Sequence, residues 1–290
     1  MALDVSQRIL SVFHTFSKSQ KKLAMLVMRD CGKVAYLTAE RLGNLAGVSE
    51  STVVRFATAL GYSGYVEFQA AVQQLVKSKL TPNERIAITK KRIGRKDIIE
   101  NVIQSDINKL RLTFENLDRD AFFRSVDAIL SAKKIYIIGA RSTEPVAKLL
   151  AHNLSLILDN VKFVEVSSTS EVFEQMFSIS KDDVLIAFSF PRYSSKVVKA
   201  VKFAAASSAK VVVVTDSKIS PLVQYATYTL IAQTDMASFM DSLVAPISII
   251  NAIIVEITQR NERQILERFD KLEELWDDYD VYTTPTKSTK

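Results

Sequence analysis

The stretch TAERLGNLAGVSESTVVRFATAL, residues 38–60, decides the fold of the N-terminal part of this chain. It reads as a helix, a tight turn and a second helix. Thr38 can cap the first helix, because its hydroxyl accepts a hydrogen bond from an unpaired backbone N–H. Gly47 falls where the chain must turn sharply, and glycine takes a positive φ at little cost. Ser49 can cap the second helix, whose apolar residues recur at helical spacing. We therefore expect a helix-turn-helix; the alternative is an ordinary helical hairpin of a core.

The exposed side of the second helix, residues 49–60, is rich in hydrogen-bonding side chains. In a helix-turn-helix, the second helix enters the major groove of DNA. Arg55 is the best candidate for contact with a guanine, and the hydroxyl groups are suited to phosphates or base edges. The residues predicted to bind DNA are Thr38, Ser49, Glu50, Ser51, Thr52 and Arg55.

The composition of the chain indicates which classes of protein it can belong to. The chain has 290 residues, 48% of them hydrophobic, and a net charge of +6, which fits about two globular domains and a nucleic-acid partner. The single cysteine, Cys31, excludes an intrachain disulfide and suits a reducing cytoplasm. Only two histidines are present, so we expect no metal site and no cofactor. The sequence lacks a signal-peptide layout and an apolar run long enough for a membrane, so we expect a cytoplasmic protein.

Changes of composition divide the chain into four parts. Residues 1–80 are expected to form the helix-turn-helix DNA-binding domain with its supporting helices. Residues 81–96 contain Pro82 and a basic cluster and are expected to be a linker. Residues 97–282 should form a second domain, and 283–290 a disordered polar tail.

After residue 131 the pattern changes to alternating strand and helix, which predicts βαβ units and a parallel sheet in a three-layer α/β domain. A long apolar helix is expected over 236–258. A further helix over 97–117 is expected to turn its apolar side inward, and that side comprises Ile98, Val102, Ile103, Ile107, Leu110 and Phe114. The expected strands are 133–139, 161–166, 183–189, 210–216 and 228–233.

Two strand-to-helix loops contain the candidate ligand-binding residues, because ligands bind beyond the carboxyl ends of strands in such sheets. The loop GARSTEP, 139–145, places hydroxyl groups at a helix start, which favours an anion. The loop SFPRYSS, 189–195, adds hydroxyl groups and a guanidinium. The loops would converge on one phosphate or carboxylate; the alternative is that their serines only cap helices. The predicted effector-binding residues are Arg141, Ser142, Thr143, Ser189, Arg192, Ser194 and Ser195.

These patterns taken together, LTAERLGNLAGVSESTVVRFATALGYSGYVEF followed by IYIIGARST and DVLIAFSFPRYSS…VVVVTD, resemble the RpiR family of bacterial transcriptional regulators. That family joins an N-terminal helix-turn-helix domain to a sugar isomerase (SIS) domain that senses phosphosugars. The resemblance implies a five-stranded parallel sheet flanked by helices, and a homodimer or homotetramer formed largely through the SIS domain. It also implies a sugar-phosphate effector.

Both loops depart from the SIS pattern. The first usually reads Gly-x-Gly-x-Ser; here Gly139 matches, but Arg141 replaces the second glycine and Thr143 the serine. The second usually reads Ser-x-Ser-Gly-x-Thr; here Arg192 replaces its glycine and Ser194 its threonine, with proline in place of the middle serine. We therefore expect either an effector more acidic than a simple hexose monophosphate or a phosphate gripped by guanidinium groups. Alternatively, the arginines point outward or form salt bridges, and the site is degenerate.

A phosphosugar isomerase would need a base, and the candidates each have a structural explanation. His152 lies within the predicted helix after the first loop, and Glu144 suits the dipole at the start of that helix. Glu171 and Glu174 fit a solvated helix face. We therefore predict no catalytic residue and a DNA-binding regulator that reads an inverted-repeat operator as an oligomer. The alternatives are an isomerase with a helical appendage and a sugar-phosphate-binding accessory protein.

Overall fold

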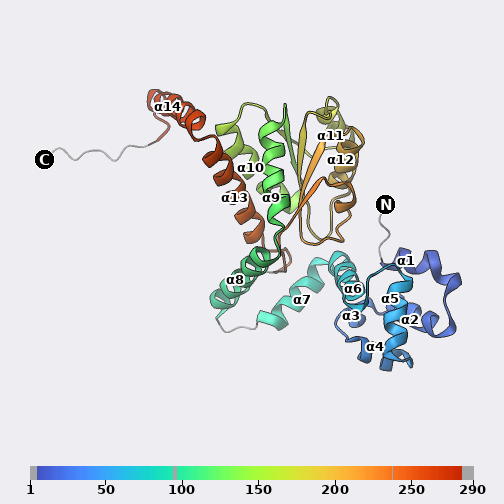
Figure 1. Cartoon of the computed structure of the whole chain (residues 1–290). Helices are drawn as coiled ribbons and strands as arrows, with labels where there is room; N and C mark the ends of the chain where they lie inside the picture. Colours follow the sequence, from blue (N-terminus) through green and yellow to red (C-terminus); the bar gives the residue numbers. More distant parts are fainter. Residues whose placement is uncertain (1–4, 94–96, 237, 283–290) are drawn as a thin grey trace.

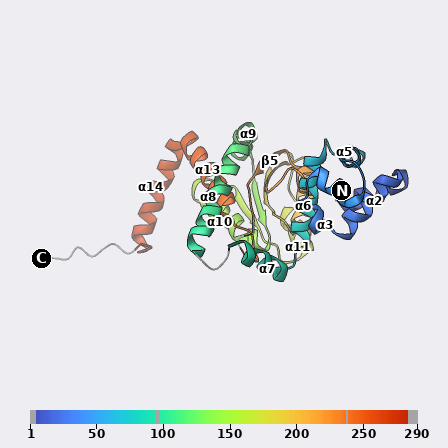
Figure 2. The ribbon, with the colours of Figure 1, turned by 90° about the horizontal axis from the view of Figure 1, so that it is seen from below.

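The computed structural model describes residues 5–93, 97–236 and 238–282. An N-terminal group of helices lies beside an α/β unit, and α7 (Pro82–Ile93) lies between them in the chain (Figure 1). The view from below shows α14 (Glu262–Asp278) at the end of the molecule away from the N-terminal helices (Figure 2). The tail predicted to be disordered, 283–290, is outside the described residues.

The N-terminal helices enclose their own hydrophobic core. Its centre is a row of aromatic rings in which Phe56 lies between Phe16 and Phe68, at centroid distances of 5.3 and 5.7 Å. Leu23, Leu42 and other apolar side chains surround these rings. The elements are α1 (Val5–Val12), a 3-10 turn (Phe13–Thr15), α2 (Lys18–Arg29), α3 (Cys31–Val34), α4 (Ala39–Ala46), α5 (Glu50–Ala59) and α6 (Tyr65–Lys79).

Helices α4 and α5 form the predicted helix-turn-helix. Thr38 caps α4, because its Oγ1 accepts from the Arg41 N–H at 3.2 Å, and Ser49 Oγ accepts from the Thr52 N–H of α5 at 3.3 Å. Gly47 has φ 65°, the left-handed conformation expected at the turn. The sequence-based cap and turn assignments are therefore confirmed.

Gly43 lies under the turn that joins α4 to α5. A Cβ atom at this position would lie 2.8 Å from the Val48 carbonyl oxygen and 3.4 Å from the Glu50 nitrogen. We expect Gly43→Ala to lower the free energy of unfolding by about 1–3 kcal/mol, because the backbone of the turn would have to shift. Thermal unfolding followed by circular dichroism measures the effect. Gly32→Ala is the control, since nothing lies within 4 Å of its Cβ position; equal stability of the two variants would contradict the prediction.

The C-terminal unit is a five-stranded parallel sheet with strand order β2-β1-β3-β4-β5, as the sequence predicts. Strands β1, β3 and β4 are central, and nearly all of their residues are buried. Helices lie on both faces of the sheet (Figure 1). The strands are β1 (Ile135–Gly139), β2 (Val161–Val164), β3 (Val184–Phe188), β4 (Lys210–Thr215) and β5 (Tyr228–Ile231).

Alternate residues of the strands feed two separate cores. Ile137 and Ile186 belong to the core formed with α9, α10 and α13. Tyr136 and Leu185 belong to the core on the other face, formed with α11 and α12. This period of two accounts for the three layers. The helices are α8 (Ile98–Asn116), α9 (Arg119–Ser131), α10 (Glu144–Ile157), α11 (Thr169–Met176), α12 (Ser195–Ala206) and α13 (Val244–Arg260), with 3-10 turns at Arg141–Thr143 and Val223–Tyr225.

The helix predicted over 236–258 begins later than expected. Helix α13 begins at Val244, and Met236 instead forms an antiparallel bridge with Asp241. Pro246 gives the reason, because proline is tolerated in the first turn of a helix but breaks a helix that continues before it. Residues 235–236 and 238–242 consequently belong to a loop before α13 rather than to a helical turn.

The segment predicted as a linker, 81–96, contains helix α7, whose Arg85 and Thr89 are buried. The following helix, α8, corrects another expectation. Four of its apolar residues that were expected inward are about half or more exposed, namely Ile98, Ile103, Ile107 and Phe114. Lys109 and Thr113 are buried instead. A single copy of the chain therefore leaves an apolar face of α8 uncovered.

Candidate DNA-binding helix and effector pocket

The predicted DNA contacts lie on an exposed surface around the N-terminal half of α5. Glu50, Ser51 and Arg55 are exposed, whereas Val53 and Phe56 of the same helix are buried in the domain core. Arg55 Nε donates a hydrogen bond to the Ser51 carbonyl at 3.3 Å, which directs the guanidinium along the exposed side of the helix. This surface is therefore accessible to a partner and is not packed into the protein.

Two of the predicted hydroxyl groups also have a structural role. Thr38 and Ser49 cap α4 and α5, and Ser49 Oγ lies 3.0 Å from Ser51 Oγ and 2.8 Å from Thr52 Oγ1. These short contacts order the hydroxyl groups at the start of α5. A helix N-terminus with ordered hydroxyl groups and backbone N–H groups is suited to a phosphate.

The positive charge of the chain is concentrated in the N-terminal domain. Residues 1–80 contain ten Lys or Arg and five Asp or Glu, whereas the rest of the chain is almost balanced, since the whole carries +6. Basic residues that neutralise phosphates supply much of the affinity for DNA. The charge distribution thus agrees with the position of α5.

The two strand-to-helix loops meet at a cavity of about 360 Å³ beyond the carboxyl ends of β1 and β3. The N-termini of α10 and α12 follow these loops, so their backbone dipoles favour an anion here. Ser195, the first residue of α12, is not among the residues that line the cavity. The predicted residues that do line it are Arg141, Ser142, Thr143, Ser189, Arg192 and Ser194.

Both arginines that stand in place of glycine retain a glycine-like backbone. Arg141 has φ 58° and Arg192 has φ 66°, which is the left-handed region. This conformation costs a residue with a Cβ roughly 1–2 kcal/mol. Strained backbone tends to persist at functional sites. Both arginines line the cavity.

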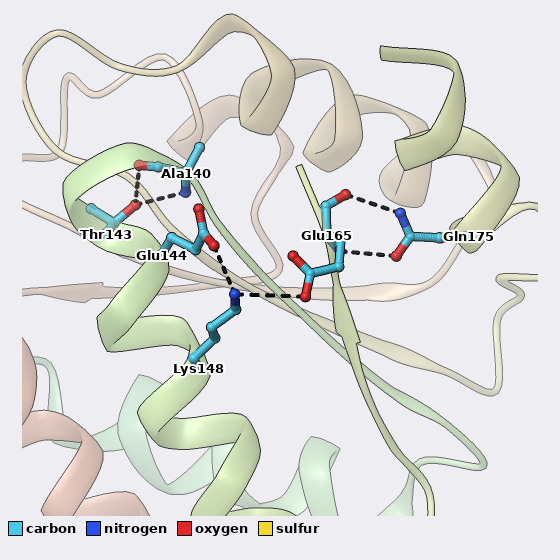
Figure 3. A network of polar contacts seen from close by, with 6 residues as sticks. All are labelled: Ala140, Thr143, Glu144, Lys148, Glu165 and Gln175. Carbon is cyan, nitrogen blue, oxygen red and sulfur yellow. Dashed lines mark hydrogen bonds and ion pairs between the residues drawn. The ribbon is translucent and has the colours of Figure 1, made fainter. Parts of the chain in front are cut away.

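Thr143 and Gly139 fix the shape of the first loop. The Ala140 N–H donates to Thr143 Oγ1 at 3.0 Å, and the same oxygen lies 3.1 Å from the Phe188 carbonyl (Figure 3 shows the contacts with Ala140). A Cβ at Gly139 would lie 2.5 Å from the Thr143 carbonyl oxygen. The Thr143 hydroxyl therefore ties β1 to β3 and has little capacity left for a ligand.

Five further residues that line the cavity come from α7 and from the loop before α13, and no sequence pattern predicts their place there. They are Pro82, Arg85, Phe239, Met240 and Asp241. Arg85 Nη1 lies 3.1 Å from Asp241 Oδ1. No local pattern connects two residues that are 156 positions apart, so the sequence alone contains no signal for this pair.

Two candidate bases for isomerisation, Glu144 and His152, are not lining residues of this cavity, although Glu144 directly follows the lining residue Thr143. Glu144 forms an ion pair with Lys148 at 2.8 Å, and Lys148 Nζ is also 3.6 Å from Glu165 (Figure 3). The hydrogen bond that Lys148 donates to the Glu144 carboxylate raises the pKa of Lys148. His152 is exposed on the side of α10. Among the described residues that line the cavity, neither Glu144 nor His152 appears.

Loop 189–195 also contacts the helix-turn-helix domain. Tyr193, which follows Arg192, donates to Asp216 Oδ1 at 2.8 Å and accepts from the side-chain amide of Gln74 on α6. Burial and the neighbouring Asp216 carboxylate raise the pKa of the Tyr193 hydroxyl, so it remains a donor. Ile219, from the loop after β4, packs against the N-terminal core, and a cavity of about 500 Å³ lies along this contact.

An exposed second helix on a basic helical domain, joined to a parallel sheet with a cavity at the ends of its central strands, defines a DNA-binding regulator with a ligand-binding domain. The chain belongs to the RpiR family of helix-turn-helix transcriptional regulators. The pattern "Helix-turn-helix domain, rpiR family" matches residues 3–85, and the pattern "SIS domain" matches residues 128–256.

Known proteins of the same organisation are similar along most of the chain. An HTH-type transcriptional regulator of Thermotoga maritima is 26% identical over 91% of this chain and 95% of its own. The sugar isomerase domain of the Sphaerobacter thermophilus RpiR transcription factor is 26% identical, with a TM-score of 0.57 over 60% of this chain and 96% of that chain. The Vibrio vulnificus NanR protein, solved in complex with ManNAc-6P, is 22% identical, with a TM-score of 0.60 over 95% of this chain and 99% of that chain.

Two negative findings concern the described part of the chain only. None of its helices combines the length and the apolar character needed to cross a membrane. None of its groups of His, Cys, Asp and Glu side chains is arranged to hold a metal ion.

Proposed function

We propose that α5 binds an operator in the major groove and that a phosphosugar or acidic sugar in the pocket alters operator affinity. One observation carries the link between the two sites. Loop 189–195 presents Arg192 to the pocket and Tyr193 to Gln74 of the DNA-binding domain. A ligand that moves this loop would change a contact with α6, and α6 packs against α5. Such a regulator acts in the cytoplasm, together with the DNA that it binds.

The character of the pocket supports a ligand that is both anionic and hydroxylated. It combines the guanidinium groups of Arg141 and Arg192 with serine hydroxyls and two helix N-termini. Guanidinium groups bind phosphate or carboxylate with paired hydrogen bonds. The bound ManNAc-6P of the Vibrio vulnificus NanR structure supports the same ligand class for this chain. Because the pocket lining offers neither His152 nor Glu144 as a base, we propose sensing and not isomerisation.

The function is tested with the full chain. Immobilised protein is incubated with sheared chromosomal DNA, and the retained fragments are sequenced. A panel of sugar phosphates and sugar acids is then screened for release of the retained fragment and for a shift in thermal unfolding. We expect one inverted-repeat fragment and one compound that alters its retention. Absence of any retained fragment, or steady conversion of aldose and ketose phosphates in a coupled assay, would contradict the proposal.

We propose that a second copy of the chain covers the exposed apolar face of α8. Ile103, Ile107 and Phe114 on that face are 54%, 49% and 68% exposed, which is costly for a helix that remains in water. A twofold dimer buries the same face on both copies and matches an inverted-repeat operator.

Ile107→Asp is expected to weaken this dimer by about 2 kcal/mol or more, because it places a charge in an apolar interface. Light scattering should give twice the chain mass of 32.4 kDa for the wild type and a lower mass for the variant at micromolar concentration. Gln104→Asp, an exposed position outside the apolar face, is the control. A wild-type protein that is monomeric throughout, or an unaffected Ile107→Asp dimer, would exclude this interface.

A further inference from the structure

The pocket has a second group of lining residues that the proposed anion contacts leave unexplained. Arg85 comes from α7, and Phe239, Met240 and Asp241 come from the loop before α13. Phe239 and Met240 are about half exposed, whereas Arg85 is only 3% exposed. This group therefore places an ion pair in the cavity lining and apolar side chains beside it.

A contribution to the free energy of unfolding does not readily explain the Arg85–Asp241 ion pair. The Arg85 and Asp241 side chains are 3% and 15% exposed, and their charged atoms lie 3.1 Å apart. The loss of hydration in such a pair offsets most of its Coulombic attraction. The contact does hold the Asp241 carboxylate in a defined position at the pocket.

The charges in the cavity divide it into two parts. A phosphate is attracted to Arg141, Arg192 and the two helix N-termini, and it is repelled by the Asp241 carboxylate. A carboxylate is, however, a strong acceptor for sugar hydroxyl groups. We infer that Asp241, held by Arg85, binds the hydroxyl groups of the effector and determines which sugar is accepted. This inference rests on the proposed effector function of the pocket.

Part of this group of lining residues lies on α7, the helix that connects the two domains. Thr89 Oγ1 donates to the Ser238 carbonyl at 3.4 Å, so α7 is attached to this loop at two points, one turn apart. Helix α7 follows α6 after a short break at residues 80–81. A sugar bound to Asp241 consequently lies against the helix that leads to the DNA-binding domain.

The test compares phosphate with phosphosugars on the full chain. Calorimetric titrations of wild type and Asp241→Asn use inorganic phosphate, glucose 6-phosphate and N-acetylmannosamine 6-phosphate as probes. We expect wild type to bind a phosphosugar more tightly than inorganic phosphate. Asp241→Asn should lose about tenfold or more in phosphosugar affinity, while its affinity for inorganic phosphate stays equal or rises.

Two further variants separate recognition from folding. Arg85→Gln/Asp241→Asn removes both buried charges and should show the same selective loss. Asp235→Asn changes the same charge in the same loop outside the cavity lining and should bind all probes as wild type does. Equal losses for phosphate and phosphosugar, or an unchanged phosphosugar affinity in Asp241→Asn, would overturn the inference and leave the effector function standing. Failure of wild type to bind any probe would overturn both.

Discussion

Arg55→Ala is expected to lower operator affinity by about 1–3 kcal/mol, or roughly 5- to 150-fold, through loss of a paired contact with a guanine. Arg55 is exposed, and the Ser51 carbonyl is its hydrogen-bond partner within the protein. The variant should therefore fold as wild type does. Fluorescence anisotropy with the operator duplex selected from chromosomal DNA measures the change.

The control for Arg55→Ala is a variant that removes one positive charge far from α5. Arg263→Ala serves, because Arg263 is 92% exposed on α14, at the end of the molecule away from the N-terminal helices. Arg55→Lys separates base contact from charge: it keeps the positive charge but loses the paired geometry, so it should relax sequence preference more than total affinity. If Arg55→Ala and Arg263→Ala bind the operator equally well, α5 does not read the DNA through this residue.

Arg192→Gly should make the protein more stable and at the same time impair its response to effector. Relief of the left-handed conformation at φ 66° should add about 1 kcal/mol to the free energy of unfolding. Loss of the guanidinium should weaken binding of a phosphosugar by about tenfold or more, because charge-assisted hydrogen bonds are strong. Differential scanning calorimetry and calorimetric titration measure the two effects, and Arg141→Gly at φ 58° should behave in the same way.

Ser208 offers a matched control for the arginine positions. It is exposed after α12 with φ 62°, and it is not among the residues that line the effector cavity. Ser208→Gly should therefore gain similar stability with no change in ligand affinity. An Arg192→Gly variant that binds the effector as tightly as wild type would show that the guanidinium points away from the ligand, as the degenerate-site alternative states.

Local signals explain why so much of the fold was predictable from sequence. The caps at Thr38 and Ser49 and the positive φ of Gly47 depend on neighbouring residues only, and short β-branched runs between helical stretches specify a parallel sheet. The two loops that line the cavity, 139–145 and 189–195, are predictable because they follow the central strands β1 and β3. The pocket that they form then depends only on sheet order, which βαβ connections restrict strongly.

The structure corrects one expectation that depends on contacts distant in sequence and another that depends on a local proline. The apolar pattern of α8 predicts a buried face, but several of its residues are exposed, because a pattern does not specify what covers a face. The expected start of α13 is too early, because Pro246 is tolerated in the first turn of a helix and limits how far the helix extends before it. The Arg85–Asp241 pair depends on how α7 packs on the loop before α13, and no motif records that packing.

The most direct test of the account is linkage between the two sites, measured with one protein. Operator affinity is determined with and without the sugar phosphate found in the screen, and sugar-phosphate affinity is determined with and without the operator. The account predicts that each ligand changes the affinity of the other by the same factor, typically about 5- to 150-fold, because the two sites share one coupling free energy. A factor of one in both directions, with each ligand still bound, would show that α5 and the pocket are independent and would contradict the account.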